Sequence, residues 1–225
     1  MIETLHWDKL HLGHSVIPAS HVLHGEYVRL VMNYPCQLSF MQQMFLLEDE
    51  CRNRDWKMWL ESSGETCPSG TSEFSARIGS MIHHRGIIAN LTLRENLLLP
   101  FLYHGDQQRL ESAAAEMVEV TRWLEIDAML DEKAGERTTF THALVSLARC
   151  MLAKPAIIVA QEVHIGMPPD HLERFRALSM QALTQLGSGL LYLTASIDEG
   201  SGLDYARTLT IALHDQNLQR GEKVG

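Results

Sequence analysis

The sequence predicts an α/β protein with a mainly parallel sheet and flanking helices. Residues 156–160 form a wholly apolar run without alternation, which is typical of a strand buried on both faces of a parallel sheet. A helical pattern over 141–153 and the turn Lys154-Pro155 precede this run. A helix over 170–186 and a strand over 189–194 follow it, and such alternation of helices with strands indicates parallel pairing.

The remaining elements complete a single domain. Short strands are predicted over 4–12, 20–23, 27–32 and 57–61, and helices over 38–50, 93–100 and 107–125. The last of these helices has one apolar face, formed at steps of three and four residues by Leu110, Ala114, Met117, Val118, Thr121 and Leu124. A loop over 133–136 and a closing pair of strands from about 208 to 220 are also expected.

Composition and charge exclude several classes of protein. Of the 225 residues, 45% are hydrophobic and 21% charged, the balance of an ordinary globular protein. The 28 acidic and 19 basic residues give a net charge of −9, which disfavours nucleic acid and anionic membrane surfaces as partners. No apolar run approaches the about 20 residues of a bilayer span, and the four cysteines form no Cys-x-x-Cys pair. We expect reduced thiols in the cytoplasm and no direct insertion into a membrane.

Two long segments carry a resemblance to a known family. Residues 145–169 contain Val-Ser-Leu-Ala-Arg, the Lys-Pro turn and a strand that ends in Gln161-Glu162. Residues 78–105 contain Asn-Leu-Thr-Leu-Arg-Glu-Asn-Leu-Leu-Leu-Pro. Both resemble ATP-binding cassette (ABC) ATPases, the first after the signature motif and the second from the glutamine loop into the helical subdomain. Residues 24–31 and 205–221 resemble the strand before the phosphate loop and the closing segment, so the resemblance covers nearly the whole chain.

This resemblance implies a P-loop NTPase-like ABC ATPase fold. Residues 1–225 would form one ABC ATPase-like domain with a mainly parallel sheet, flanking helices and an amino-terminal antiparallel β portion. Residues 1–84 and 137–225 would form the RecA-like core with that β portion, and residues 85–136 the helical subdomain.

The segment at the phosphate-loop position departs from the family pattern Gly-x-x-x-x-Gly-Lys-Ser/Thr. In such a loop, glycines let backbone N–H groups point at the phosphates, and the lysine adds positive charge. Met32 and Gln37 stand at the glycine positions and Leu38 at the lysine position, while Ser39 remains at the magnesium-coordinating position. Hydrogen bonds to charged groups contribute roughly 1.5–3 kcal/mol each, so losing the lysine and two amides forfeits ~5 kcal/mol, about four decades of affinity.

Other motif positions also depart from the family pattern. The resemblance places Gln161 where the family has the aspartate that orients magnesium, and Glu162 at the general-base position. His83 stands at the glutamine position, Ala195 replaces the switch histidine, and residues 137–141 (Arg-Thr-Thr-Phe-Thr) replace the signature Leu-Ser-Gly-Gly-Gln. Glu162 could polarise a water only if a nucleotide were bound, and otherwise caps the end of a strand.

The twelve histidines do not predict a metal site. His83, His84 and His164 could approach Glu162 in the fold, but no His-x-x-x-His or Cys/His ligand pattern occurs. We expect exposed or core-edge histidines and no metal ion. No cofactor is expected, unless the chain is the active ATPase considered below, which would use ATP and magnesium.

The resemblance implies a pseudo-ATPase, a subunit without hydrolysis that docks on or regulates a membrane transport complex. The segment from Asn90 to Gly105 keeps the family pattern, and in transport ABC proteins the groove beside it receives a helix of the membrane-spanning subunit. A lipid- or lipoprotein-trafficking system is one such setting. The protein would then lie in the cytoplasm, at the inner face of the cell membrane when bound to its partner. The resemblance also implies a dimer, either with a second copy of this chain or with an ABC-like chain.

Two other functions stay open at this stage. A functional ABC transporter ATPase with an atypical site would couple ATP binding and hydrolysis to transport through Ser39 and Glu162, with Gln161 and His83 at the remaining nucleotide and magnesium positions. The third candidate is a soluble interaction protein that uses the same fold without a membrane partner.

Overall fold

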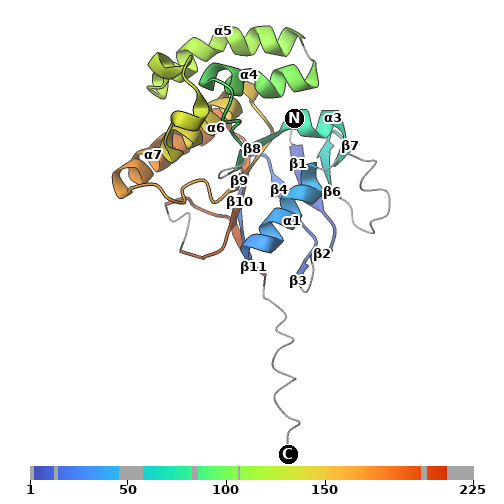
Figure 1. Ribbon diagram of the computed structural model, residues 1–225. Helices are drawn as coiled ribbons and strands as arrows, with labels where there is room; N and C mark the ends of the chain where they lie inside the picture. Colours follow the sequence, from blue (N-terminus) through green and yellow to red (C-terminus); the bar gives the residue numbers. More distant parts are fainter. Residues whose placement is uncertain are drawn as a thin grey trace, which may run out of the picture.

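The computed structural model describes residues 3–12, 15–45, 58–82, 86–105, 107–198 and 202–211. A five-stranded parallel sheet lies at its centre, in the order β11-β5-β10-β9-β8 (Figure 1). The strands are β5 (Tyr27–Val31), β8 (Ile78–Ile82), β9 (Ile157–Gln161), β10 (Gly189–Thr194) and β11 (Arg207–Thr210). All four pairings between them are parallel, so the predicted α/β fold with a mainly parallel sheet is confirmed.

The central strands contribute side chains to two hydrophobic cores. Ile158 and Ala160 of β9 pack with the helices on one face of the sheet. Ile157 and Val159 pack on the other face, with the antiparallel strands and α1 (Tyr34–Phe45). Because both faces are covered, every position of the strand is buried, which explains the apolar run without alternation.

The antiparallel part lies beside the central sheet. It has the order β4-β1-β6-β7, formed by β1 (Glu3–Trp7), β4 (Ser20–Leu23), β6 (Met58–Ser62) and β7 (Glu65–Pro68). The prediction of one strand over 4–12 is wrong, because the strand is interrupted at Asp8-Lys9 and β2 (Leu10–Leu12) pairs separately with β3 (Ser15–Ile17). Strand β6 matches the predicted strand over 57–61, of which residue 57 lies outside the described residues.

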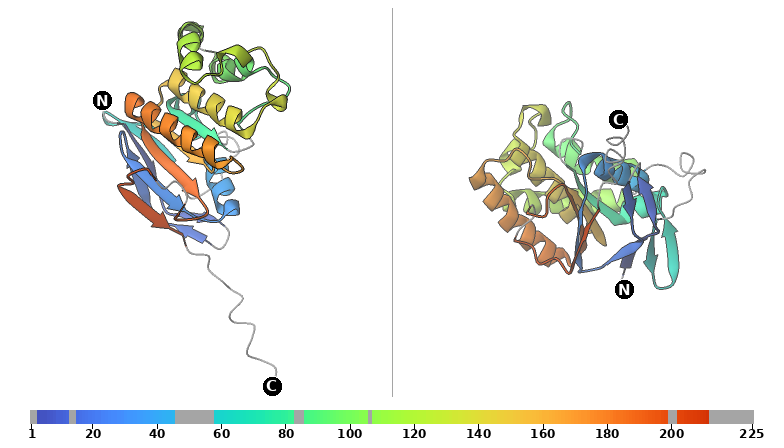
Figure 2. Two further views of the ribbon diagram at one scale, coloured as in Figure 1. Left: turned by 90° about the vertical axis from the view of Figure 1, so that its left-hand side faces the viewer. Right: turned by 90° about the horizontal axis from the view of Figure 1, so that it is seen from below.

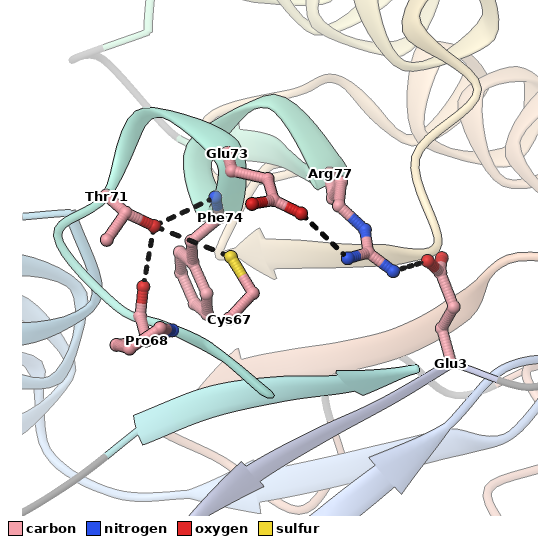
Figure 3. Close-up of polar contacts among 7 residues, drawn as sticks. All are labelled: Glu3, Cys67, Pro68, Thr71, Glu73, Phe74 and Arg77. Carbon is pink, nitrogen blue, oxygen red and sulfur yellow. Dashed lines mark hydrogen bonds and ion pairs between the residues drawn. The ribbon is translucent and has the colours of Figure 1, made fainter. Parts of the chain in front are cut away.

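A short helix that the sequence did not predict, α3 (Ser72–Arg77), joins the two sheets (Figure 3). Thr71 caps its start, where the Thr71 hydroxyl accepts a hydrogen bond from the Phe74 amide at 3.2 Å. At the other end Arg77 forms ion pairs with Glu73 of the same helix and with Glu3 of β1. The helix is therefore tied to the antiparallel sheet at the point where the chain enters β8.

The described residues also form helices α4 to α7, each longer than α3. Helices α6 (Thr139–Ala153) and α7 (Pro169–Leu186) lie side by side on one face of the parallel sheet, and α4 (Leu93–His104) and α5 (Gln107–Trp123) lie beyond α6 (Figure 2). Two 3₁₀ turns, η1 (Asp127–Met129) and η2 (Ala134–Glu136), lead from α5 to α6. No helix in the described ranges is long and apolar enough to cross a membrane.

Helix α4 continues past Pro100, so the predicted end at residue 100 is wrong. Its start is held by a capping box, in which the Thr92 hydroxyl accepts from the Glu95 amide (3.1 Å) and the Glu95 carboxylate accepts from the Thr92 amide (2.7 Å). Buried Leu97 and Phe101 on either side of the proline fix the helix to the core. This packing offsets the loss of one backbone hydrogen bond at Pro100.

Two further boundaries differ from the sequence-based expectations. Helix α6 begins at Thr139, two residues before the predicted start at 141, and α5 ends at Trp123. Of the predicted closing strands, β11 is present, and residues 212–225 lie outside the described residues. The division into a RecA-like core and a helical subdomain over 85–136 stays a prediction.

Candidate functional site

The junction between β5 and α1 occupies the predicted phosphate-loop position. Strand β5 ends at Val31 and α1 begins at Tyr34, with Met32 and Asn33 between them. The helix was predicted to begin at 38, so most of the segment expected to form a loop is helical instead. Pro35 lies in the first helical turn, where a missing N–H is tolerated.

Two amides near the start of α1, those of Cys36 and Gln37, are bonded to Asn33. The side-chain oxygen of Asn33 accepts from the Cys36 amide at 2.9 Å, and the carbonyl of Asn33 accepts from the Gln37 amide at 3.0 Å. Pro35 has no N–H to offer. A helix start binds anions through unpaired N–H groups, and these three residues provide none here.

The side chain of Gln37 links this turn to the end of β9. Gln37 is 0% exposed, and its Nε2 donates to the Met32 carbonyl (3.0 Å) and to Oε1 of Glu162 (2.8 Å). Glu162 is itself only 4% exposed and has a φ of 45°, in the left-handed region that few non-glycine residues adopt. The sequence indicates this contact only through a glutamine at a position where the family pattern has glycine, and the sequence analysis did not predict that Gln37 would contact Glu162.

The other predicted site residues are placed as follows. Gln161 ends β9 and is buried, and its Nε2 and the Oε1 of Gln37 find no hydrogen-bond partner within the described part of the chain. Ser39 is half-buried in the second turn of α1. His83 lies outside the described residues. The structure therefore joins Glu162 directly to Gln37, a residue that the sequence-based site did not include.

The signature and switch positions have local structural roles. At the signature position, Thr138 caps α6, and its hydroxyl accepts from the Thr141 amide at 3.2 Å. At the switch position, the Thr194 hydroxyl bonds the backbone of Ser196, and Ala195 is exposed without a functional group. The polar groups of both segments thus hold turns and helix ends.

Metal ligands do not converge in the part of the chain that the structure describes. No group of three or more His, Cys, Asp or Glu side chains there could hold a metal ion. His164 Nδ1 lies 2.7 Å from the hydroxyl of Tyr192, a hydrogen bond that accounts for one nitrogen of its ring. His83 and His84 lie outside the described residues.

A groove runs beside α4, between that helix, α3, β8 and α6. Its volume is about 630 Å³. Leu99, Pro100 and Tyr103 of α4 form one wall, and Thr71 and Ser75 at α3 belong to the opposite wall. Tyr103 is 73% exposed, so a large aromatic side chain stands at the edge of the groove. The groove thus lies against the segment 90–105 that keeps the family pattern.

Two arginines line the groove. Arg149 donates to uncharged acceptors: to the Asn96 carbonyl (2.6 Å), to Oδ1 of Asn96 (3.0 Å) and to the Gly86 carbonyl. Burial lowers the pKa of Arg149 to about 10, with a small opposing effect from Cys150. Arg109 donates to the carbonyls of Ala76 and Ala153 at 3.2 and 3.3 Å. The groove therefore combines apolar walls with a positively charged lining.

The arrangement of elements is that of the ABC ATPases. An ATP-binding cassette of an ABC transporter in its ADP conformation aligns with 87% of this chain and 82% of its own, with a TM-score of 0.62 and 16% sequence identity. The structure of cbiO1 from Clostridium perfringens, part of the ABC transporter complex cbiONQ, aligns with 86% of this chain and 79% of its own, with a TM-score of 0.63 and 10% identity. The chain therefore has an ABC ATPase fold, as its sequence predicted.

Curated relatives give a narrower comparison. The chain is similar to the Nod factor export ATP-binding protein I of Burkholderia orbicola, with 28% identity over 127 residues, 55% of this chain and 41% of the relative. It is also similar to the lipoprotein-releasing system ATP-binding protein LolD of Porphyromonas gingivalis, with 24% identity over 128 residues, 57% of this chain and 58% of the relative. The match thus spans about half the length of these relatives. No family model matches the chain.

Proposed function

We propose that this chain is an ABC-type ATP-binding-subunit-like protein without ATP hydrolysis, which docks on or regulates a membrane transport complex. The observation that carries the proposal is the buried hydrogen bond between Gln37 and Glu162, across a junction where α1 starts almost directly after β5. The two curated relatives are named as ATP-binding proteins of an export system and of a lipoprotein-releasing system, which supports the transport setting.

The chemistry of the junction does not suit ATP and magnesium. A phosphate group needs several inward-pointing N–H donors and a positive charge. The Cys36 and Gln37 amides are already bonded to Asn33, and Leu38 stands where the lysine would be. Moving Gln37 aside would also break its bond to buried Glu162, at a cost of roughly 1.5–3 kcal/mol. Gln161 offers magnesium a neutral amide in place of a carboxylate.

The groove beside α4 suits a helix of a membrane-spanning partner that carries an acidic side chain. Its apolar wall from Leu99, Pro100 and Tyr103 can receive the apolar face of such a helix. Arg149 keeps its charge among uncharged acceptors, so a carboxylate in the groove would gain a charge-assisted contact. The partner would hold the protein at the cytoplasmic face of the membrane.

Calorimetric titration and a hydrolysis assay test the loss of nucleotide chemistry. The full chain is titrated with ATP and with ADP, each with magnesium, and phosphate release is measured in parallel. We expect no saturable binding and no release above the buffer rate, for the chain and for its Glu162→Gln variant alike. Hydrolysis at ordinary ABC rates that Glu162→Gln abolishes would instead establish the alternative, an active ATPase with an atypical site.

Site-specific photo-crosslinking tests the docking surface. A photoreactive phenylalanine analogue replaces Tyr103 at the groove, and a matched control places it at Val118, an exposed position on α5. We expect the Tyr103 position to crosslink to a membrane-spanning protein in isolated membranes, and the control to give no such product. Equal products from both positions, or none from Tyr103, would count against docking at the groove.

A further inference from the structure

The groove beside α4 also has the size and composition of a pocket for a small molecule. Ligand pockets usually measure about 300–1,000 Å³ and have mainly apolar walls with a few polar groups. This groove measures about 630 Å³, and most of its lining is apolar. Among the apolar lining residues, Leu99 and Pro100 are half-buried and Ile88 is 46% exposed. An alkyl chain in the groove can therefore contact these walls.

The charge within the groove is positive. Arg149 and Arg109 are the only charged side chains of its described lining, which contains no Asp or Glu. Arg149 donates to the uncharged acceptors of Asn96 and Gly86, and none of the ion pairs among the described residues includes it. An anionic group in the groove would therefore give Arg149 a charged partner.

The two arginines approach the same wall of the groove. Arg149 and Ala153 are four residues apart on α6, so they lie on one face of that helix. Arg109 of α5 donates to the Ala153 carbonyl at 3.3 Å and to the Ala76 carbonyl at 3.2 Å. Arg109 thus meets α6 about one helical turn from Arg149, and their hydrogen bonds hold both side chains in place before a ligand binds.

We propose that this groove binds a medium-chain aliphatic carboxylate, with its alkyl chain against the apolar walls and its carboxylate at Arg149 and Arg109. The contact between a guanidinium and a carboxylate is a charge-assisted hydrogen bond, which is stronger than a neutral one. A dry cavity of about 150 Å³ holds benzene, so roughly four times that volume has room for a ten-carbon chain. The ligand would use the groove of the proposed docking function, but its binding requires no partner protein.

Calorimetric titrations of the full chain test the chemistry of the ligand. Decanoate, hexanoate, decanol and decylamine serve as probes, each below the concentration at which it forms micelles. We expect decanoate to bind at one site and at least about tenfold more tightly than hexanoate, because four more methylenes leave water. Decanoate should also bind more tightly than decanol, which lacks the charge, and decylamine should not bind because the arginines repel it.

Variants test the location of the site. Arg109→Gln should weaken decanoate about fivefold and leave decanol unchanged, because one half-buried charge is lost. Arg122→Gln removes an exposed charge from the same helix outside the groove, so this matched control should leave decanoate binding unchanged. Leu99→Glu places a carboxylate in the apolar wall and should abolish decanoate binding, with circular dichroism to verify that the variant is folded.

The proposal is overturned if decanoate does not bind, or if folded Leu99→Glu binds it as tightly as the natural chain. It is also overturned if Arg122→Gln and Arg109→Gln have equal effects. Absence of the Tyr103 crosslink would count against docking of a partner but would not change these titrations, so the two proposals fail independently.

Discussion

Replacing Gln37 by leucine should destabilise the protein through the buried carboxylate that it leaves behind. The amide nitrogen of Gln37 donates to the Met32 carbonyl and to Glu162, and both Gln37 and Glu162 are almost completely buried. Leucine has a similar volume but no donor. The buried Glu162 carboxyl group would then lack this donor, which costs more than removing both groups together.

The magnitude follows from these two hydrogen bonds. A bond to a charged group contributes roughly 1.5–3 kcal/mol and a bond between neutral groups roughly 0.5–1.5 kcal/mol. We therefore expect Gln37→Leu to lower the free energy of unfolding by ~3 kcal/mol. For a chain of this size, that loss corresponds to a decrease in the unfolding midpoint of roughly 6–12 °C.

Urea unfolding followed by circular dichroism measures this effect. Gln37→Leu should lower the urea midpoint at an unchanged m-value. In a protein that already carries Glu162→Gln, the same substitution should lower the free energy of unfolding by only ~1.5 kcal/mol, because the acceptor that loses its donor is then a neutral amide. If Gln37→Leu changes the free energy of unfolding by less than about 0.5 kcal/mol, the range of ordinary surface substitutions, Gln37 does not hold this junction together.

Three further predictions concern other parts of the fold. Gly189→Ala should lower the free energy of unfolding by at least ~2 kcal/mol in urea titrations, because the new Cβ would lie 2.3 Å from the Leu23 carbonyl oxygen; an unchanged midpoint would contradict this. Thr92→Ala removes the cap of α4 and should cost ~1 kcal/mol in the same assay, whereas a change within experimental error would mean that the capping box is dispensable. Burial lowers the pKa of His6 below its ordinary value of 6.5, an effect that Glu61 opposes and His21 reinforces. The stability that His6 contributes is therefore complete above pH 6.5 and is lost as the pH falls through its lower folded pKa. Between about pH 7 and pH 5, His6→Phe should therefore reduce the pH dependence of the urea unfolding midpoint. An unchanged pH dependence would exclude His6 as the source of that fall.

The central strands were predicted because their signal is local. Residues 156–160 are apolar throughout, and a strand covered on both faces by two cores requires such a run wherever it lies in the chain. The start of α4 at Leu93 agrees with the predicted helix over 93–100, and its capping box is also local, because Thr92 and Glu95 lie within four consecutive residues.

The predicted ends of helices were wrong where contacts with residues distant in the sequence override the local preference. Pro100 suggested a helix end, yet the core contacts of Leu97 and Phe101 carry α4 on to His104. The start of α1 was placed too late because the family pattern implies a loop there, whereas Asn33 provides a cap that allows the helix to begin at once. Strand β7 and helix α3 were missed because they are short, with four and six residues, and so carry little periodic signal.

Local pattern was thus enough for the parallel sheet and for the helix over 93–100. Three-dimensional packing was needed for the contacts at the junction of β5 and α1 and for the groove beside α4. Gln37 and Glu162 are 125 residues apart, and Asn96 and Arg149 are 53 residues apart, so no sequence spacing relates them. Hydrogen bonds of this kind depend on how the sheet and helices bring distant segments together, because each partner taken alone is an ordinary polar residue.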